Sequence, residues 1–419
     1  MEKEILENYA KAIVEVGINL QRGQSVVIRL EPELEEFATL VATHCYIKGA
    51  KQVVFSYTSS RLTNVALKYS NIEDLSIVNQ YEEGYYKFTA EEKPCLIWLD
   101  GEDPDGLLGV DSNKVAAVKK NKMKVLLKYI EAYDNQSQWT IVGVPTKRWA
   151  KKMFPDMNEE EAVEKLWKLI LITARSYSGN SVDNWNEHQA NFKKRSDYIN
   201  SLNLVSLHYK SKKGTDLTVG LIKGVKFLGG SEEVNGIEFQ PNMPTEEIFT
   251  SPMKGEAEGI AYSTKPLCYQ GQMIEDFYVR FHEGKAVEAD AKVGKEALLS
   301  ILTLDEGSAY LGECALVPVT SYVNKAADIL NGEGKEHEDV LFYNTLFDEN
   351  AACHLALGKG FINLYPDYEK YSADEIYNKG INKSFSHVDF MIGDETLSIT
   401  GRDENGKEYP LIKDGLWAF

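Results

Sequence analysis

The sequence predicts a mixed α/β protein: an N-terminal α/β domain with a mostly parallel sheet, followed by a C-terminal α+β domain rich in antiparallel strands. Helical and β-rich segments alternate through the first half of the chain, whereas short strands separated by turn signals dominate from Leu204 onward. The length of 419 residues also favours two domains, because one hydrophobic core rarely grows that large. We place the division in a long polar helical segment, which gives domains 1–185 and 186–419.

The first half alternates regularly between the two kinds of element. Helical periodicity covers Lys3–Val16 and Pro32–Lys48, and each helix precedes a β-rich run, at 24–30 and 52–57. Further helical segments are predicted at 61–69 and 159–175, and further strands at 95–99 and 140–144. Such alternation is typical of a parallel sheet covered by helices. No G-x-G-x-x-G or phosphate-binding loop follows the first strand, so we expect a scaffold and no nucleotide site.

The second half of the chain has the sequence pattern of β-hairpins. The runs LVSLHYK and LTVGLI flank a polar turn, and DFYVRFH and AVEADA flank the turn Glu283-Gly284-Lys285. A helix is predicted at 292–302. Antiparallel strands with one covered face account for this pattern, and all the candidate functional residues lie in this half.

Composition excludes several classes of partner. The formal net charge of −18 disfavours nucleic acid and anionic membrane surfaces. No apolar run approaches the length of a membrane span, and the first residues lack the apolar core of a signal peptide. The five cysteines are scattered without C-x-x-C spacing, which indicates reduced thiols. We therefore expect a cytoplasmic protein.

The segment SFSHVDFMIG carries the clearest local geometry. Side chains of a strand over 385–392 alternate between two faces, so His387 and Asp389 share one face and could bind one ion. Imidazole and carboxylate suit Zn²⁺, Co²⁺ or Mn²⁺. On this motif alone, a His–Asp pair on a half-buried strand is the more common explanation.

Two further motifs place carboxylates among apolar residues. Glu246 and Glu247 stand in PNMPTEEIFTSP, and Glu313 stands in LGECALVP. A solvated acidic pair or a structural salt bridge would explain each motif singly. A buried carboxylate, however, needs a partner, and a metal ion is one.

Together with His354 from LFYNTLFDENAACHLALG, these residues make a five-member candidate ligand set. Such a set could hold two ions that share a bridging acid, as in two-metal hydrolytic sites. The set comprises Glu247, Glu313, His354, His387 and Asp389. Asp348 and Glu349 precede His354 closely and are candidates to orient its ring.

Several long motifs taken together resemble the thermophilic-type metallo-aminopeptidases. They are PNMPTEEIFTSP, GTDLTVGL, TKPLCYQGQMIEDF, LGECALVPV, LFYNTLFDENAACHLALG, SHVDFMIG and the terminal WAF. The resemblance implies removal of N-terminal residues from peptides by a pair of divalent metal ions, a metal-binding C-terminal domain and a homodimer. It also assigns the metal ligands to the five residues of the candidate set.

Two departures from the family pattern stand out. A polar stretch at 324–339 lengthens the segment before His354, and its glycines favour a mobile surface excursion. Phe361 stands where the family has a tyrosine, whose hydroxyl would stabilise the developing oxyanion. Tyr365 shares a face with Phe361 if this segment is a strand, and it is then the nearest substitute donor.

The sequence therefore predicts a metal-dependent aminopeptidase that acts through a metal-activated water. We expect Glu247 to bind metal and Glu246 to act as general base, because neighbours in an extended segment diverge. Two alternatives stay open: a metal-dependent hydrolase of another small amide, and a catalytically weak, dimeric metal- or peptide-binding protein.

Overall fold

A computed structural model describes residues 1–134, 136–269, 272–332 and 337–419. The chain forms two compact units. The first contains Met1–His188, Gly230–Thr245 and a short segment that begins at Ala326. The second contains Gln189–Gly229, Glu246–Lys325 and His337–Phe419.

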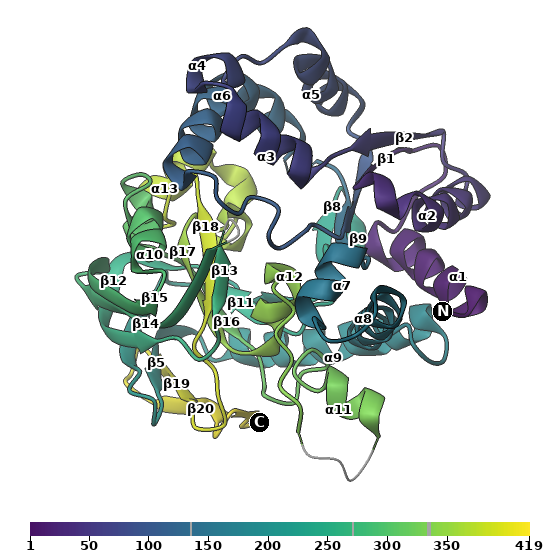
Figure 1. Ribbon diagram of the computed structural model, residues 1–419. Helices are drawn as coiled ribbons and strands as arrows, with labels where there is room; N and C mark the ends of the chain where they lie inside the picture. The colour runs from purple at the N-terminus through teal and green to yellow at the C-terminus, as the bar shows by residue number, and fades with distance from the viewer. Residues whose placement is uncertain (135, 270–271, 333–336) are drawn as a thin grey trace. The chain divides into compact units, whose positions relative to one another are not determined.

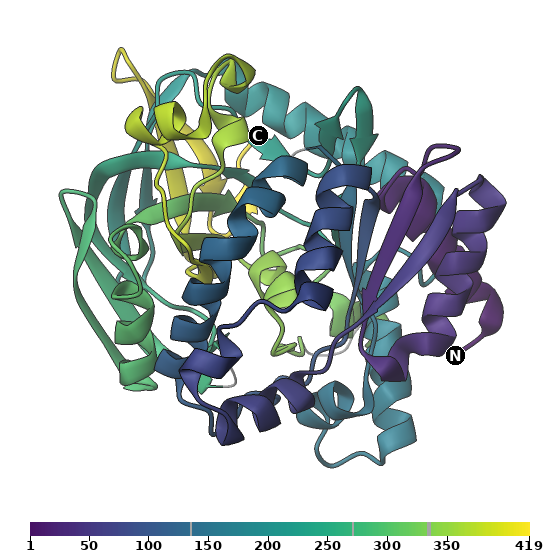
Figure 2. The ribbon, with the colours of Figure 1, turned by 90° about the horizontal axis from the view of Figure 1, so that it is seen from above.

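The first unit is built on a parallel sheet with the strand order β10–β4–β3–β1–β2. Its strands are β1 (Ser25–Leu30), β2 (Gln52–Tyr57), β3 (Cys95–Asp100), β4 (Trp139–Gly143) and β10 (Asn242–Met243). Val26, Val27 and Ile28 of β1 are all buried, as expected for a central parallel strand covered on both faces. Helices α1 (Lys3–Ala12) and α2 (Glu35–Lys48) lie on one side of the sheet (Figures 1 and 2).

Four of the remaining helices, α4 to α7, were not predicted from the sequence, and two of them, α5 and α6, pack against each other. Each begins at a polar cap: the side chain of Asn79 accepts the Glu82 N–H, and that of Asp111 accepts the Asn113 N–H. The helices are α3 (Ser60–Tyr69), α4 (Ile72–Leu75), α5 (Gln80–Glu92), α6 (Ser112–Tyr133), α7 (Lys147–Met153), α8 (Glu159–Thr173) and α9 (Ser181–Ser201), the last of which continues into the second unit.

The second unit contains two antiparallel sheets. The larger has the order β13–β14–β12–β6–β5–β19–β20–β21, and β15 also pairs with β14. Its strands are β5 (Leu204–Lys210), β6 (Asp216–Leu221), β12 (Pro252–Tyr262), β13 (Leu267–Tyr269), β14 (Gln272–His282), β15 (Lys285–Val293), β19 (Ser398–Asp403), β20 (Glu408–Lys413) and β21 (Leu416–Trp417). Helix α10 (Lys295–Leu302) packs on β14 and β15. The predicted fold class, a parallel α/β part followed by an antiparallel α+β part, is confirmed.

The smaller sheet has the order β18–β17–β16–β11–β7. Its strands are β7 (Leu228–Gly229), β11 (Ile248–Thr250), β16 (Leu311–Leu316), β17 (His354–Gly358) and β18 (His387–Met391). One face is apolar: Leu355, Leu357, Val388 and Phe390 all belong to the buried core of the unit. Because strand side chains alternate, the residues between them point away from that core.

No helix in the described ranges is both long and apolar enough to cross a membrane.

The polar stretch at 324–339 differs from the expected surface excursion. Residues Ala326–Asn331 form helix α11, which packs against α8, and Ala326 and Ala327 are buried. The small alanine side chains allow the two helices to approach closely. The polarity and the glycines of the segment do not indicate this contact. The segment 333–336, with Gly334, lies outside the described residues.

This packing predicts that α11 contributes to stability. Ala326→Asp would bury a charge in the contact with α8, so we expect a loss of roughly 2 kcal/mol and a fall in Tm of about 4–8 °C by calorimetry. Ile329→Asp on the exposed side of the same helix is the control and should change Tm little. Equal Tm values for both variants would mean that α11 is dispensable.

Candidate metal centre

The candidate ligands gather on the face of the smaller sheet opposite the apolar core. Ala356 of β17 pairs with Glu313 of β16 on one side and with Asp389 of β18 on the other, so these three residues form a row across the sheet. His354 lies two residues before Ala356 on the same strand, and His387 pairs with Gly358, two residues after it. The register therefore places two imidazoles diagonally on either side of two carboxylates.

Small residues of β17 stand between the candidate ligands. Ala356 has only a methyl group on the ligand face, and Gly358 has no side chain. A Cβ atom at Gly358 would lie 2.1 Å from the Ser386 carbonyl oxygen, and its φ of +107° disfavours other residues. Gly358 is thus required by the close approach of the β18 side of the sheet, and Ala356 is the small residue between Glu313 and Asp389.

The adjacent acids Glu246 and Glu247 diverge, as an extended segment predicts. Both precede β11, which pairs with β16. A carboxylate oxygen of Glu247 lies 3.0 Å from Nε2 of His354. The Glu246 backbone N–H donates to the Asn350 side chain over 2.6 Å, and its carboxylate lies within electrostatic range of Arg195.

Two groups of ligand atoms result, and they share Glu313. Glu247, Glu313 and His354 form one group, and Glu313, His387 and Asp389 form the other; within each, the candidate ligand atoms lie within 4.8 Å of one another. Nε2 of His387 lies 3.0 Å from Glu313 and 3.3 Å from Asp389. The structure therefore brings together all five residues of the candidate set.

Both imidazoles are oriented through their other nitrogen. Nδ1 of His354 lies 3.1 Å from the Ala352 carbonyl oxygen, and Nδ1 of His387 lies 2.8 Å from the Lys359 carbonyl oxygen. A carbonyl oxygen only accepts, so Nδ1 carries the hydrogen in both rings. In the neutral imidazole, Nε2 then has a free lone pair directed at the carboxylates, which is the tautomer that a metal ligand needs.

Burial and proximity alter the protonation of the cluster. Burial raises the pKa of Glu313 to about 7, against the hydrogen bond from His387 and with support from the Glu247 charge. Burial alone would lower the pKa of His354, but the hydrogen bond to Glu247 and the surrounding carboxylates outweigh it and raise this pKa to about 10. Protonated imidazoles thus balance the buried carboxylates when no other cation does.

The residues that precede His354 do not hold its ring as expected. The ring bonds to the Ala352 backbone, whereas the Asp348 carboxylate accepts the backbone N–H groups of Phe342 and Asn344. Asp348 thus fixes its own loop. Burial, together with the charges of Asp389 and Glu247, raises the pKa of Glu349 well above its usual range, which places a further carboxylate beside the cluster.

Phe361 lies beside the cluster, whereas Tyr365 packs against Tyr371. The Phe361 ring packs 5.1 Å from the His387 ring and 5.4 Å from that of Phe249. Ile362–Leu364 is a 3₁₀ turn and not a strand, so the condition under which Phe361 and Tyr365 would share a face is not met. The Tyr365 ring instead packs edge-on against Tyr371 at 5.7 Å.

The donor set fits divalent cations. Three buried carboxylates in one hollow are unstable without balancing positive charge. Oδ1 of Asp389 is buried and receives no well-aligned hydrogen bond from the described residues. Glu247, Glu313 and His354 could hold one ion, and Glu313, His387 and Asp389 a second; such mixed oxygen and nitrogen donors suit Zn²⁺, Co²⁺ or Mn²⁺.

Comparison with known proteins agrees with this chemistry. A family model described as thermophilic metalloprotease (M29) matches residues 2–417. Aminopeptidase AmpS of Bacillus subtilis is 37% identical over 416 residues (99% of this chain and 98% of the relative), and Aminopeptidase 2 of Geobacillus stearothermophilus is 36% identical over 420 residues (100% and 98%). The structure of wild-type AmpT from Thermus thermophilus superposes with a TM-score of 0.87 at 32% identity, covering 100% of both chains. These matches confirm the resemblance seen in the motifs, and the chain belongs to the thermophilic metalloprotease family (M29), a family of peptide hydrolases.

Proposed function

We propose that this protein is a two-metal aminopeptidase that removes the N-terminal residue from peptides with a free α-amine. The observation that carries the proposal is Glu313, whose carboxylate belongs to both groups of candidate ligands. A shared acid of this kind is what two neighbouring ions need. The names of the relatives support the choice of aminopeptidase over another amide hydrolase.

In this proposal the five side chains bind the ions, and a neighbouring carboxylate accepts the proton of the attacking water. Bound divalent ions would polarise the scissile carbonyl, lower the pKa of the attacking water and hold the free amine. His354 and His387 would bind through Nε2, because backbone carbonyls hold the hydrogen on Nδ1. A carboxylate beside the ions would accept the proton of the water, a step typically worth about 10²–10⁴-fold.

Two carboxylates are candidates for the proton acceptor. We assign the role to Glu246, because its carboxylate lies within electrostatic range of Arg195 and because Glu247 already contacts His354. Glu349 is the competitor, since its carboxylate interacts with Asp389, Glu247 and Glu313.

The proposal includes a cytoplasmic homodimer. The five cysteines are free thiols and four of them are buried, which suits a reducing compartment. The dimer rests on the family resemblance, and its mass in solution by light scattering tests it.

One experiment tests the proposal most directly. Metal-depleted protein is supplied with Zn²⁺, Co²⁺ or Mn²⁺ and assayed against aminoacyl reporter amides and their N-acetylated counterparts. The free-amine substrates should be hydrolysed only after metal is restored, and acetylation should abolish cleavage. Cleavage of acetylated substrates would instead indicate a general amide hydrolase.

Removing a ligand should remove metal and activity together. We expect His387→Ala and Asp389→Ala to lose bound metal, measured by elemental analysis, and turnover, while circular dichroism stays native. His208→Ala is the matched control, because His208 lies on β5 of the same unit and pairs with Asp216 at an exposed site. Full metal content in either ligand variant would refute the assignment.

Substitutions of the two adjacent acids should distinguish metal binding from proton transfer. Glu247→Gln should lose metal, whereas Glu246→Gln should keep metal and lose about 10²–10⁴-fold in kcat. Glu349→Gln is assayed beside them. If it alone combines full metal content with lost turnover, Glu349 is the general base and Glu246 a structural partner of Arg195.

Restoring the family tyrosine should accelerate the reaction. Phe361 occupies the packing position against His387 but has no hydroxyl to stabilise the oxyanion, a contribution worth about 10²–10³-fold in comparable sites. Phe361→Tyr should therefore raise kcat with little change in KM. Tyr365→Phe is the control and should change neither; a marked loss in that variant would show that Tyr365 supplies the missing donor.

A further inference from the structure

We propose that Asn350 is a positioning residue for the carboxylate that activates the attacking water: its side-chain amide lies between Glu246 and Glu349 and holds the first of them in place. This inference rests on the proposed aminopeptidase function. It assigns a role to a neutral side chain that neither binds the ions nor takes the proton.

The backbone of Glu246 depends on a side chain for its hydrogen bond. Glu246 is buried, with 7% exposure, and it precedes the first ladder pair of β11, which joins Ile248 to Leu316. A buried backbone N–H nearly always has a partner. The partner of the Glu246 N–H is Oδ1 of Asn350, at 2.6 Å. The amide of Asn350 thus fixes the backbone from which the Glu246 carboxylate extends.

The nitrogen of the same amide anchors Asn350 itself. Nδ2 donates to the Leu346 carbonyl oxygen at 2.8 Å, in helix α12 (Thr345–Asp348). Carbonyl groups in the last turn of a helix lack partners within the helix, and the amide supplies a donor there. Nδ2 also lies 3.4 Å from a carboxylate oxygen of Glu349. Asn350 has 0% exposure, so these contacts are shielded from water.

The contacts of Asn350 match the chemistry of an amide. The Glu246 N–H needs an acceptor, whereas the carbonyl oxygen of Leu346 needs a donor, and these two partners determine which way the amide is turned. Aspartate would keep the acceptor but would place a second carboxylate beside Glu349. An apolar residue would leave the buried Glu246 N–H without its partner.

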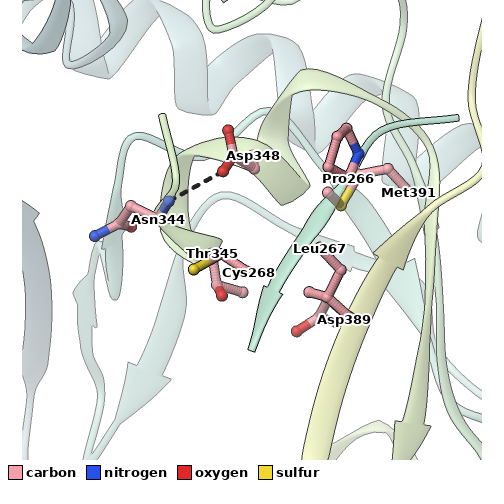
Figure 3. A pocket seen from close by; sticks show the side chains of 8 residues that line it. All are labelled: Pro266, Leu267, Cys268, Asn344, Thr345, Asp348, Asp389 and Met391. Carbon is pink, nitrogen blue, oxygen red and sulfur yellow. Dashed lines mark hydrogen bonds between the residues drawn. The ribbon is translucent and has the colours of Figure 1, made fainter. Parts of the chain in front are cut away.

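The segment that carries Asn350 is held by its own hydrogen bonds. One oxygen of Asp348 accepts the Phe342 N–H at 2.7 Å, and the other accepts the Asn344 N–H at 3.0 Å. Figure 3 shows this segment beside Asp389 of β18, with the bond between Asn344 and Asp348 drawn as a dashed line. A side chain on such a fixed segment can hold its partner in one position.

The contact should matter more for Glu246 than for Glu247. The Glu247 carboxylate has a restraint of its own, since it lies 3.0 Å from Nε2 of His354 and belongs to a group of candidate ligands. Glu246 is in neither of the ligand groups found among the described residues. The direction of its carboxylate therefore depends on its backbone. Loss of the Asn350 amide should leave the metal bound and displace the proton acceptor.

The kinetic test is Asn350→Ala. A displacement of about 1 Å can cost on the order of 10²-fold in rate, so we expect kcat for a free-amine reporter amide to fall about 10²-fold, with KM within about 3-fold. The metal content, measured by elemental analysis, should equal that of the unsubstituted protein.

Asn200→Ala is the matched control. Asn200 belongs to the same unit, accepts the Phe227 N–H at 2.8 Å and donates to the Phe227 carbonyl oxygen at 2.9 Å. This variant loses the same kinds of hydrogen bond at a place without candidate ligands, so kcat and KM should not change. An equal loss of kcat in both variants would mean that the effect follows general destabilisation, and it would overturn the proposed role.

Hydrogen exchange provides a measurement that does not depend on turnover. In metal-free protein, peptides that contain Glu246 should exchange faster in Asn350→Ala than in the unsubstituted chain, as measured by mass spectrometry. Asn350→Asp keeps an acceptor oxygen for the Glu246 N–H, so it should restore slow exchange and most of kcat. If Asn350→Ala does not fold, Asn350→Ser replaces it, because the serine hydroxyl is one bond nearer the backbone.

The remaining outcomes separate this inference from the function on which it rests. Unchanged kcat in Asn350→Ala, or loss of its metal, would overturn the positioning role and leave the aminopeptidase intact. Slow exchange in Asn350→Asp without recovery of kcat would also overturn it, because holding Glu246 would then not be what Asn350 contributes. If the unsubstituted protein hydrolyses no free-amine substrate, the proposed function fails and this role fails with it, whereas the exchange rates still show whether Asn350 holds the Glu246 backbone.

Discussion

The register of three antiparallel strands is the constraint on which the candidate site depends. β17 pairs with β16 on one edge and with β18 on the other, and Ala356 is opposite both Glu313 and Asp389. A shift of one residue in either pairing would turn every side chain of the shifted strand to the other face. It would place carboxylates in the apolar core and leucines among the ligands. The buried leucines of β17 and the core side chains of β18 therefore fix the register, and the register fixes the site.

The same arrangement concentrates negative charge that the fold must balance. Glu247, Glu313 and Asp389 are buried together, and each would cost several kcal/mol without compensation. The two imidazoles can compensate by binding protons, as the raised pKa of His354 indicates. Divalent cations supply more charge at the same place and leave the imidazoles neutral. A preference of the proposed site for metal ions over protons would follow from these electrostatics, and the backbone carbonyls orient both rings as metal ligands require.

Much of the fold and part of the site could be predicted because the sequence patterns that indicate them lie within short segments of the chain. The alternation of a strand with period two put His387 and Asp389 on one face, and the helix–strand alternation of the first half indicated a parallel sheet. The rest depends on long-range contacts. β10 joins the parallel sheet from a segment far along the chain, and α11 packs on α8 through alanines that have no distinctive pattern. Glu349 stood out in the sequence only as an acid close to His354, whereas its interaction with Asp389, Glu247 and Glu313 depends on segments far apart in the chain.

A tyrosine at position 361 could both pack against its neighbours and donate a hydrogen bond from its hydroxyl, whereas Phe361 can only pack. Its ring packs against His387 and Phe249, and its N–H donates to the Ser251 hydroxyl over 2.8 Å, so the aromatic position and the backbone around it are held by contacts that need no phenol. These contacts support the orientation of His387, whose Nδ1 is fixed nearby by the Lys359 carbonyl. Under the proposed function, phenylalanine in place of tyrosine would leave the ligand geometry supported and would remove only a donor that acts while charge develops in the transition state. A protein with this substitution should bind its ions and its substrate normally, and the consequence of Phe361 should appear in the rate of the chemical step alone.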